Sequence, residues 1–140
     1  MISQLTIFLE NEKGRLAEAT RVIADAGINM KALNIAESSE FGVIRVICDK
    51  PEAAAEALTN AGLRANVTKV MAVEVPNVPG GLADLLEKFD ELNANIEYGY
   101  CFYGAGDTAI DILKVKDPSV EAHVKAAGIK VLAPEDVYVA

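Results

Sequence analysis

Two stretches of the chain combine asparagine and glycine in a pattern suited to binding a small anion. The first runs from Asn11 to Ala17 and the second from Asn77 to Ala83, and a shift of 66 residues aligns them. In each copy a glycine turn opens a helical pattern, so backbone N–H groups at the helix start lack partners and favour a negative charge. The two loops therefore predict paired sites for a small carboxylate.

The candidate ligand-binding residues fall at two places in each copy. One place is the loop with the first helical residues, and the other is the start of the strand that follows the helix. The predicted residues are Asn11, Gly14, Arg15, Leu16, Asn29 and Met30 in the first copy, and Asn77, Gly80, Gly81, Leu82, Asn95 and Ile96 in the second.

Each loop candidate also has a purely structural interpretation. Asn11 and Asn77 could orient a ligand through their amides, or close their own loops by an Asx-type hydrogen bond. Gly14 and Gly80 could admit a ligand to backbone N–H groups, supply a positive φ, or do both. Arg15 could pair with a ligand carboxylate or remain solvated at the start of its helix. These alternatives stay open at the level of sequence.

Asn29 and Asn95 each stand where a strand begins after a helix. An asparagine that faces the core needs hydrogen-bond partners. We therefore expect each of them to bond either a ligand or another unit of the fold.

The composition restricts the class of partner. The formal net charge of −8 argues against nucleic acid and against an anionic membrane surface, because both require a basic surface. No stretch approaches the roughly 20 apolar residues of a membrane span. Met1–Leu5 lacks the pattern of a secretory signal, so we expect a cytoplasmic protein. Cys48 and Cys101 lie in apolar strand patterns and are predicted to be reduced and buried.

The sequence predicts no catalysis, no cofactor and no metal site. The single histidine, His123, is predicted to lie at a helix edge, and one histidine cannot form a multi-histidine metal site. No CxxC motif occurs, and no nucleophile stands with a base and an orienting acid. Gly104–Asp107 lacks the Lys-Ser/Thr ending of a phosphate loop and is predicted to be a hairpin turn.

The order of elements repeats, which predicts two units, residues 1–69 and 70–140, without a flexible linker. The first should comprise a strand over residues 5–9, a helix over 16–26 closed by Gly27, strands 28–36 and 41–48 around the turn 38–40, a helix from Pro51 to Gly62, and strand 64–69. The second should comprise strand 70–75, helix 82–92, strands 95–103 and 108–115, a helix with Asp117 as N-cap and Pro118 as its first residue, and strand 129–132.

Each βαββαβ unit predicts an α+β, ferredoxin-like fold, with an antiparallel four-stranded sheet and two helices on one face. The predicted inner stripe of the third helix is Leu82, Leu85, Leu86, Phe89 and Leu92, and that of the fourth is Val120, Val124 and Ala127. The second strand of each unit should lie at a sheet edge. Because an apolar edge strand associates readily, the aromatic strand 95–103 predicts a homodimer.

With this order, the N-x-x-G-x-L loops and Gly27-Ile28-Asn29 in place, the chain resembles the ACT-domain family in a tandem, stand-alone form. Asn77–Leu82 is close to that family's N-x-P-G-x-L loop, whereas the first copy has Lys13 where proline is usual. The resemblance implies regulation: a free amino acid binds at an interface between two units, near the loop after the first strand. It also implies that the chain adjusts amino-acid metabolism.

Three functions follow, in decreasing order of support. The first is an amino-acid-binding regulatory protein without its own catalysis, acting as a homodimer. The second is a regulatory subunit or interaction module that docks on an amino-acid biosynthetic enzyme. The third is a small duplicated α+β enzyme, a class that normally requires metal ligands or a clear base.

Overall fold

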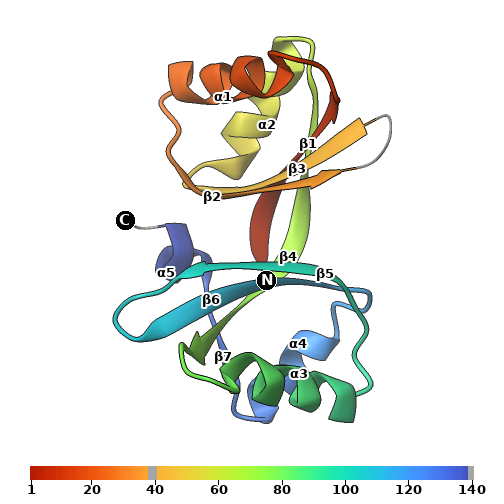
Figure 1. Cartoon of the computed structure of the whole chain (residues 1–140), viewed down its shortest axis with the longest axis vertical. Helices are drawn as coiled ribbons and strands as arrows, with labels where there is room; N and C mark the ends of the chain where they lie inside the picture. Colours follow the sequence, from red (N-terminus) through yellow and green to blue (C-terminus); the bar gives the residue numbers. More distant parts are fainter. Residues whose placement is uncertain (38–40, 139–140) are drawn as a thin grey trace. The chain divides into compact units, whose positions relative to one another are not determined.

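The computed structural model describes residues 1–37 and 41–138 (Figure 1). The predicted turn at residues 38–40 lies outside the described residues. The chain divides into two compact units, which we name by their main segments. The N-terminal unit is Ser3–Thr68 with the C-terminal residues from Tyr138, and the C-terminal unit is Lys69–Val137 with Met1–Ile2.

The ends of the chain differ from the sequence-based limits 1–69 and 70–140, and bonds inside each unit explain why. The Met1 ammonium lies 2.7–2.8 Å from both carboxylate oxygens of Glu121 in the C-terminal unit. The backbone N–H of Ser3 donates to the Tyr138 hydroxyl at 2.7 Å, and this hydroxyl donates to the Ser3 carbonyl at 2.6 Å. Each chain end therefore joins the unit to which it is hydrogen-bonded.

The N-terminal unit has the predicted arrangement of helices on one face of a sheet (Figure 1). Its sheet has the order β2-β3-β1-β4, and β3 pairs antiparallel with both β1 and β2. Its elements are β1 (Ile2–Glu10), α1 (Arg15–Asp25), β2 (Met30–Glu37), β3 (Phe41–Cys48), α2 (Pro51–Asn60) and the first part of β4 (Arg64–Pro76).

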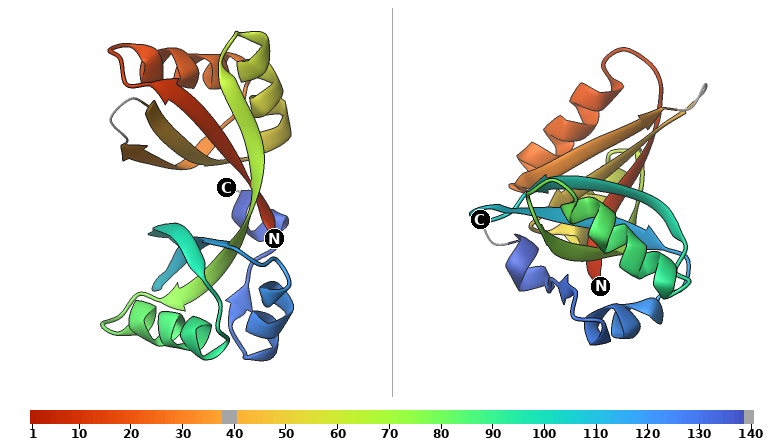
Figure 2. Two further views of the ribbon diagram at one scale, coloured as in Figure 1. Left: turned by 90° about the vertical axis from the view of Figure 1, so that its right-hand side faces the viewer. Right: turned by 60° about the horizontal axis from the view of Figure 1, so that its bottom comes forward.

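The C-terminal unit repeats this order with the second part of β4. Its sheet has the order β5-β6-β4-β7, with antiparallel pairs, and the left-hand view of Figure 2 shows α3 and α4 on the same face. Its further elements are α3 (Gly81–Glu91), β5 (Ile96–Tyr103), β6 (Thr108–Val115), α4 (Val120–Ala126), β7 (Lys130–Val131) and α5 (Pro134–Tyr138). The predicted α+β class with two βαββαβ units is confirmed, and β2 and β5 lie at sheet edges as expected.

Each unit has a hydrophobic core between its helices and its sheet. In the N-terminal unit, alternate residues of β1 pack beneath Ile23 and Leu58. In the C-terminal unit, alternate residues of β4 pack beneath Leu85, Phe89 and Val124. Full burial of one such side chain stabilises the fold by roughly 1.5–3 kcal/mol, so these contacts fix which sheet face carries the helices.

Four helices are followed by a residue with left-handed backbone conformation. Gly27, Gly62 and Gly128 follow α1, α2 and α4 with φ values of 71°, 84° and 84°. After α3 the same place is taken by Asn93, the one non-glycine among the described residues with a positive φ, at 53°. Asparagine tolerates this conformation better than other residues with a Cβ, so α3 ends in the same way without the glycine.

The two units are not related by a constant shift of 66 residues. Leu5 pairs with Val46 in the N-terminal unit, while Met71 pairs with Leu113 in the C-terminal unit, so β3 and β6 are offset by one residue more than β1 and β4. The cause is the hairpin, because β5 ends at Tyr103 and β6 begins at Thr108, one residue further than from Glu37 to Phe41. A shift of one residue places the alternate set of side chains on the core side of the sheet.

The predicted start of the fourth helix is wrong by two residues. The helix α4 begins at Val120, with Ser119 rather than Asp117 at the N-cap position. Asp117 does make a cap-like bond, because its carboxylate accepts the Ser119 N–H at 2.9 Å and this bond lowers the pKa of Asp117. It caps the turn that precedes the helix.

Part of the predicted inner face is also wrong. Leu82 and Leu86 are 49% and 39% exposed, and only Leu85 and Phe89 of their stripe are fully buried. The alanine at the end of the fourth stripe, Ala127, is exposed as well. The prediction that Cys101 is buried is wrong, whereas Cys48 is buried as expected. Cys101 lies on an edge strand, so one side of its side chain has no neighbouring strand.

The two thiols should differ in reactivity. Burial raises the pKa of Cys48 to about 11 and shields its sulfur, whereas Cys101 is exposed. Because the thiolate is the reactive form, Ellman's reagent should modify Cys101 in the folded protein and Cys48 only after unfolding in guanidinium chloride. Cys101→Ser should remove the fast reaction and Cys48→Ser should leave it; two equally fast thiols in the folded wild type would contradict this.

Candidate ligand-binding site

The helices α1 and α3 begin with nearly identical geometry. The N-cap residue of α1 is Gly14 with φ 89° and ψ −13°, and that of α3 is Gly80 with φ 88° and ψ −12°. Both values lie in the left-handed region, which a residue with a Cβ adopts only with strain. Lys13 therefore gives the same helix start as Pro79 at the matching position.

The first hydrogen bonds of the two helices also match. The N–H of Arg15 donates to the Glu12 carbonyl at 3.3 Å, and the N–H of Gly81 donates to the Val78 carbonyl at 3.1 Å. In each helix the glycine N-cap carbonyl then accepts the first regular helical bond. The repeat thus extends to the backbone bonds of both loops.

The second and third backbone N–H groups of each helix point out of the helix start without a protein acceptor. These groups belong to Leu16 and Ala17 in α1 and to Leu82 and Ala83 in α3. Glycine has no side chain to cap them, and within the described residues no other hydrogen bond reaches them. Adjacent unpaired N–H groups at the positive end of a helix dipole favour a bound anion.

The two loop asparagines do not close their loops. Asn11 and Asn77 are both exposed, and neither side-chain amide has a hydrogen-bond partner among the described residues. The backbone of Asn77 is fixed instead by its N–H, which donates to the Asp107 carbonyl at 2.9 Å. The Asx-type interpretation is thus not observed, and both amides face outward beside the helix starts.

Arg15 forms ion pairs with two acidic residues of its own unit. Its guanidinium lies 2.6 Å from Glu10 and 3.2 Å from Glu18, and its side chain is 35% exposed. Pairs this exposed contribute little to stability. They do neutralise much of the charge that Arg15 would offer to a ligand carboxylate, so the backbone N–H groups are the stronger anion donors here.

A hollow of about 140 Å³ lies beside the first loop. Its polar rim includes Asn11, Glu10 and Arg15, and its apolar walls include Leu16 and Ile35. Ile44 of β3 and the small residue Gly42 complete the sheet side. The hollow thus brings Asn11, Arg15 and Leu16 of the predicted set together within one unit.

The remaining predicted residues lie elsewhere in each unit. Asn29 and Asn95 are exposed at the start of β2 and β5, past the C-terminal ends of α1 and α3. Neither faces the core, and the N–H of Asn29 donates to the Asp49 carboxylate at 3.1 Å. Met30 and Ile96 are partly buried and pack against the hydrophobic cores. Within one unit, the structure does not bring these four residues to the loop.

The family model of the ACT domain pair matches residues 1–133. The chain belongs to the ACT domain pair family. The tandem ACT resemblance read from the loops is therefore confirmed.

Several solved structures have a similar fold. Protein BT0572 from Bacteroides thetaiotaomicron is 37% identical, with a TM-score of 0.91 over 99% of this chain and 96% of that one. The ligand-free regulatory subunit of aspartate kinase from Thermus thermophilus is 19% identical, with a TM-score of 0.65 over 90% of each chain. The corresponding subunit from Thermus flavus is 18% identical, with a TM-score of 0.62 over 90% of each chain. No curated protein matched the chain.

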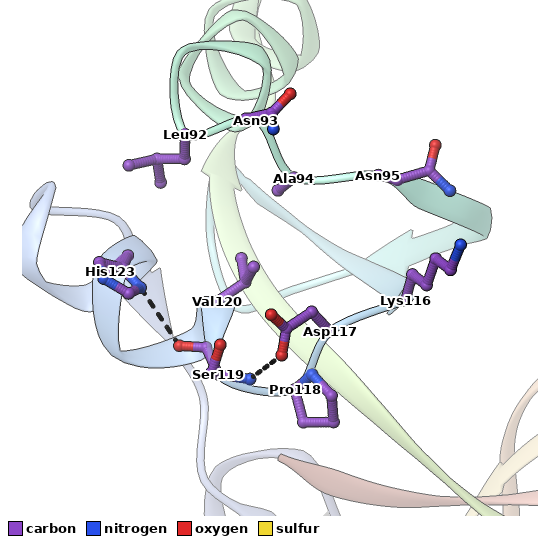
Figure 3. A pocket seen from close by; sticks show the side chains of 10 residues that line it. All are labelled: Leu92, Asn93, Ala94, Asn95, Lys116, Asp117, Pro118, Ser119, Val120 and His123. Carbon is purple, nitrogen blue, oxygen red and sulfur yellow. Dashed lines mark hydrogen bonds between the residues drawn. The ribbon is translucent and has the colours of Figure 1, made fainter.

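Another hollow of the C-terminal ACT unit lies at the opposite end from its glycine loop (Figure 3). It has a volume of about 610 Å³ and includes Asn95 and Lys116. Its other polar groups already bond one another: Asp117 accepts the Ser119 N–H, and His123 Nδ1 lies 3.3 Å from the Ser119 carbonyl. This hollow is open to solvent, and it does not contain the uncapped helix start.

Among residues 1–37 and 41–138, no three histidine, cysteine or acidic side chains gather as metal ligands would. No helix in the same ranges has the length and apolar character to span a membrane.

Sequence reasoning missed one buried acid of the C-terminal unit, Asp111. This residue lies on β6 and is only 7% exposed, and burial raises the pKa of its carboxyl above the ordinary value of 3.8. The signal was present in the sequence as an acid inside the apolar run Ala109–Leu113.

The pH dependence of stability should report this burial. Because the pKa of Asp111 is raised on folding, the native chain holds a proton that the unfolded chain releases above about pH 4. Wild-type stability therefore loses this contribution as the pH rises from about 4 through the native pKa. The melting temperature of Asp111→Asn minus that of wild type should grow between pH 4 and pH 7 in thermal unfolding. Asp90→Asn, an exposed control on α3, should show no such growth; a constant difference for Asp111→Asn would refute the assignment.

Proposed function

We propose that this ACT pair is a non-catalytic regulatory protein that binds a free amino acid at its uncapped helix starts. The observation that carries the proposal is the matched geometry of Gly14 and Gly80, which leaves adjacent N–H groups open at the start of α1 and α3. A carboxylate is the natural partner for such groups, and each charge-assisted hydrogen bond contributes roughly 1.5–3 kcal/mol.

The surroundings of the loops supply the remaining contacts of an amino acid. The amides of Asn11 and Asn77 stand beside the helix starts and can both donate and accept hydrogen bonds. At the first loop, Ile35, Ile44 and Leu16 offer an apolar wall for a ligand side chain. A small zwitterion with a partly apolar side chain fits this combination.

A regulatory role agrees with the fold relatives. Two of the similar solved structures are regulatory subunits of aspartate kinase. By analogy, the chain would dock on an enzyme of amino-acid biosynthesis and change its activity when the amino acid binds. A ligand that prefers one state of such an assembly shifts it by its differential affinity.

A thermal-shift screen with the common amino acids tests the proposal. A ligand at 100 times its dissociation constant stabilises the folded state by about 2.7 kcal/mol, so the melting temperature should rise by several degrees for at least one amino acid. If none of them raises the melting temperature, the chain is not an amino-acid sensor.

Glycine variants test the location. Gly14→Ala and Gly80→Ala should each weaken binding at their own loop by roughly tenfold, because a methyl group at the N-cap stands beside the open N–H groups. Gly27→Ala and Gly62→Ala are matched controls. All four glycines have φ between 71° and 89°, and an added Cβ meets no atom within 4 Å at any of them. Calorimetry on folded variants should separate the pairs; equal affinities would place the ligand elsewhere.

We also propose that the chain forms a homodimer. Leu33 and Ile35 on the edge strand β2 are 41% and 50% exposed. Leu82 and Leu86 on α3 are also exposed, as is Val78 in the loop before this helix. Apolar surfaces of this kind are usually covered by a partner.

Light scattering checks the homodimer. At micromolar concentration the mass should be twice the 14.9 kDa of one chain. The double variant Ile35→Lys/Leu86→Lys should lower the mass toward that of one chain, because a charge in an apolar interface is unfavourable. A wild-type mass of 14.9 kDa would refute the proposal.

A further inference from the structure

An acid stands in the core face of the C-terminal sheet. Asp111 pairs across the sheet with Val73 on β4 and with Cys101 on β5. Residues that face each other in an antiparallel pair point to the same side of the sheet. Since Val73 and Leu113 belong to the core beneath α3, the side chain of Asp111 lies on the helix side.

This carboxylate has no protein partner. Only 7% of the residue is exposed, and among the described residues no hydrogen bond or ion pair reaches its side chain. A charge that is mostly buried without a partner is unfavourable, so acids at such places are usually paired or bind a ligand. The carboxylate oxygens of Asp111 are not among the fully buried atoms, so they remain within reach of a counter-charge from outside the chain.

The register makes Asp111 the counterpart of a residue beside the first glycine loop. The one-residue shift of β6 makes Asp111 the counterpart of Ile44, since Ile44 pairs with Ile7 and Asp111 with Val73. Ile44 lines the hollow beside the first loop, together with Asn11 and Leu16. In the C-terminal unit the corresponding positions are Asn77, Leu82 and Asp111.

The residue between Asp111 and the end of the strand has a small side chain. On the helix side of β6 the next residue toward the loop is Ala109, which pairs with Val75 near the end of β4. Its small side chain corresponds to Gly42 in the first hollow. An anion at the start of α3 and a cation at Asp111 would thus lie on one side of the sheet with only a small side chain between them.

We propose that Asp111 binds the positively charged nitrogen of a ligand whose anionic group lies on the open N–H groups of α3. The ligand class is an organic ammonium, supplied either by the α-ammonium of a free amino acid or by a basic side chain. The proposal rests on the proposed function and deepens it. The first loop has an apolar floor at Ile44 and the second an acidic floor at Asp111, so the two sites select different ligands.

The experiment compares wild type with Asp111→Asn and with Asp90→Asn, whose aspartate is exposed on α3. The probes are the common amino acids, their N-acetyl derivatives, and the amines methylammonium and putrescine, each tested by thermal shift and then by calorimetry. Lysine against norleucine distinguishes a basic side chain from the α-ammonium. Because asparagine keeps the shape and removes the charge, Asp111→Asn should remain folded.

The expected result is a loss of roughly tenfold or more in affinity for the best probe in Asp111→Asn, with wild-type affinity in Asp90→Asn. The derivative that lacks the positive charge should bind wild type and Asp111→Asn equally, because it cannot form the ion pair with Asp111 in either protein. Dependence on the α-ammonium or on lysine identifies which nitrogen Asp111 holds.

Other outcomes separate the two proposals. If an amino acid binds Asp111→Asn as tightly as wild type, the role of Asp111 is overturned and the proposed function stands. If only the amines bind, and this requires Asp111, the role of Asp111 stands and the proposed function falls. If no probe shifts the wild type, both are overturned.

Discussion

The structure depends on one backbone constraint, the left-handed glycine at the start of α1 and α3. With φ near 89° at both Gly14 and Gly80, the chain turns from strand into helix without a capping side chain. Relative to glycine, a serine or aspartate cap stabilises a helix by only a few tenths of a kcal/mol, so the chain gives up little stability here. What it retains is a pair of helix ends whose unpaired donors can be satisfied by something other than the protein.

Because of this constraint, an anion at a helix start of the ACT pair would stabilise the first turn of that helix. Helix starts without caps fray more readily, and an anion that satisfies their donors strengthens them. The cores at Ile23 and Phe89 hold the other side of the same helices. Each helix is therefore anchored on the sheet while the N–H groups of its first turn stay without protein partners.

Much of the fold could be predicted because local chemistry decided it. Glycine after a helical pattern fixed the ends of α1, α2 and α4, and the Val- and Ile-rich runs gave β3 and β6 with their observed bounds. The exposure of Leu82 and Cys101 could not be predicted, because it depends on how the other elements of the unit cover α3 and β5. In the candidate site, the helix starts followed from the glycine spacing, but Asp111 did not. A constant shift of 66 residues aligns it with Arg45, and only the strand register shows that its counterpart is Ile44.

The longer hairpin between β5 and β6 bears on how the halves of such a protein diverge. One residue added in an exposed turn leaves the scaffold intact yet inverts the facing of the following strand. A charged residue that would have pointed away from the helices then lines their side, without any substitution next to the loop. The side chains that face the helices of a tandem repeat can thus be changed by an insertion in a distant turn. Comparing halves column by column would overlook such a change, whereas comparing hydrogen-bonded partners reveals it.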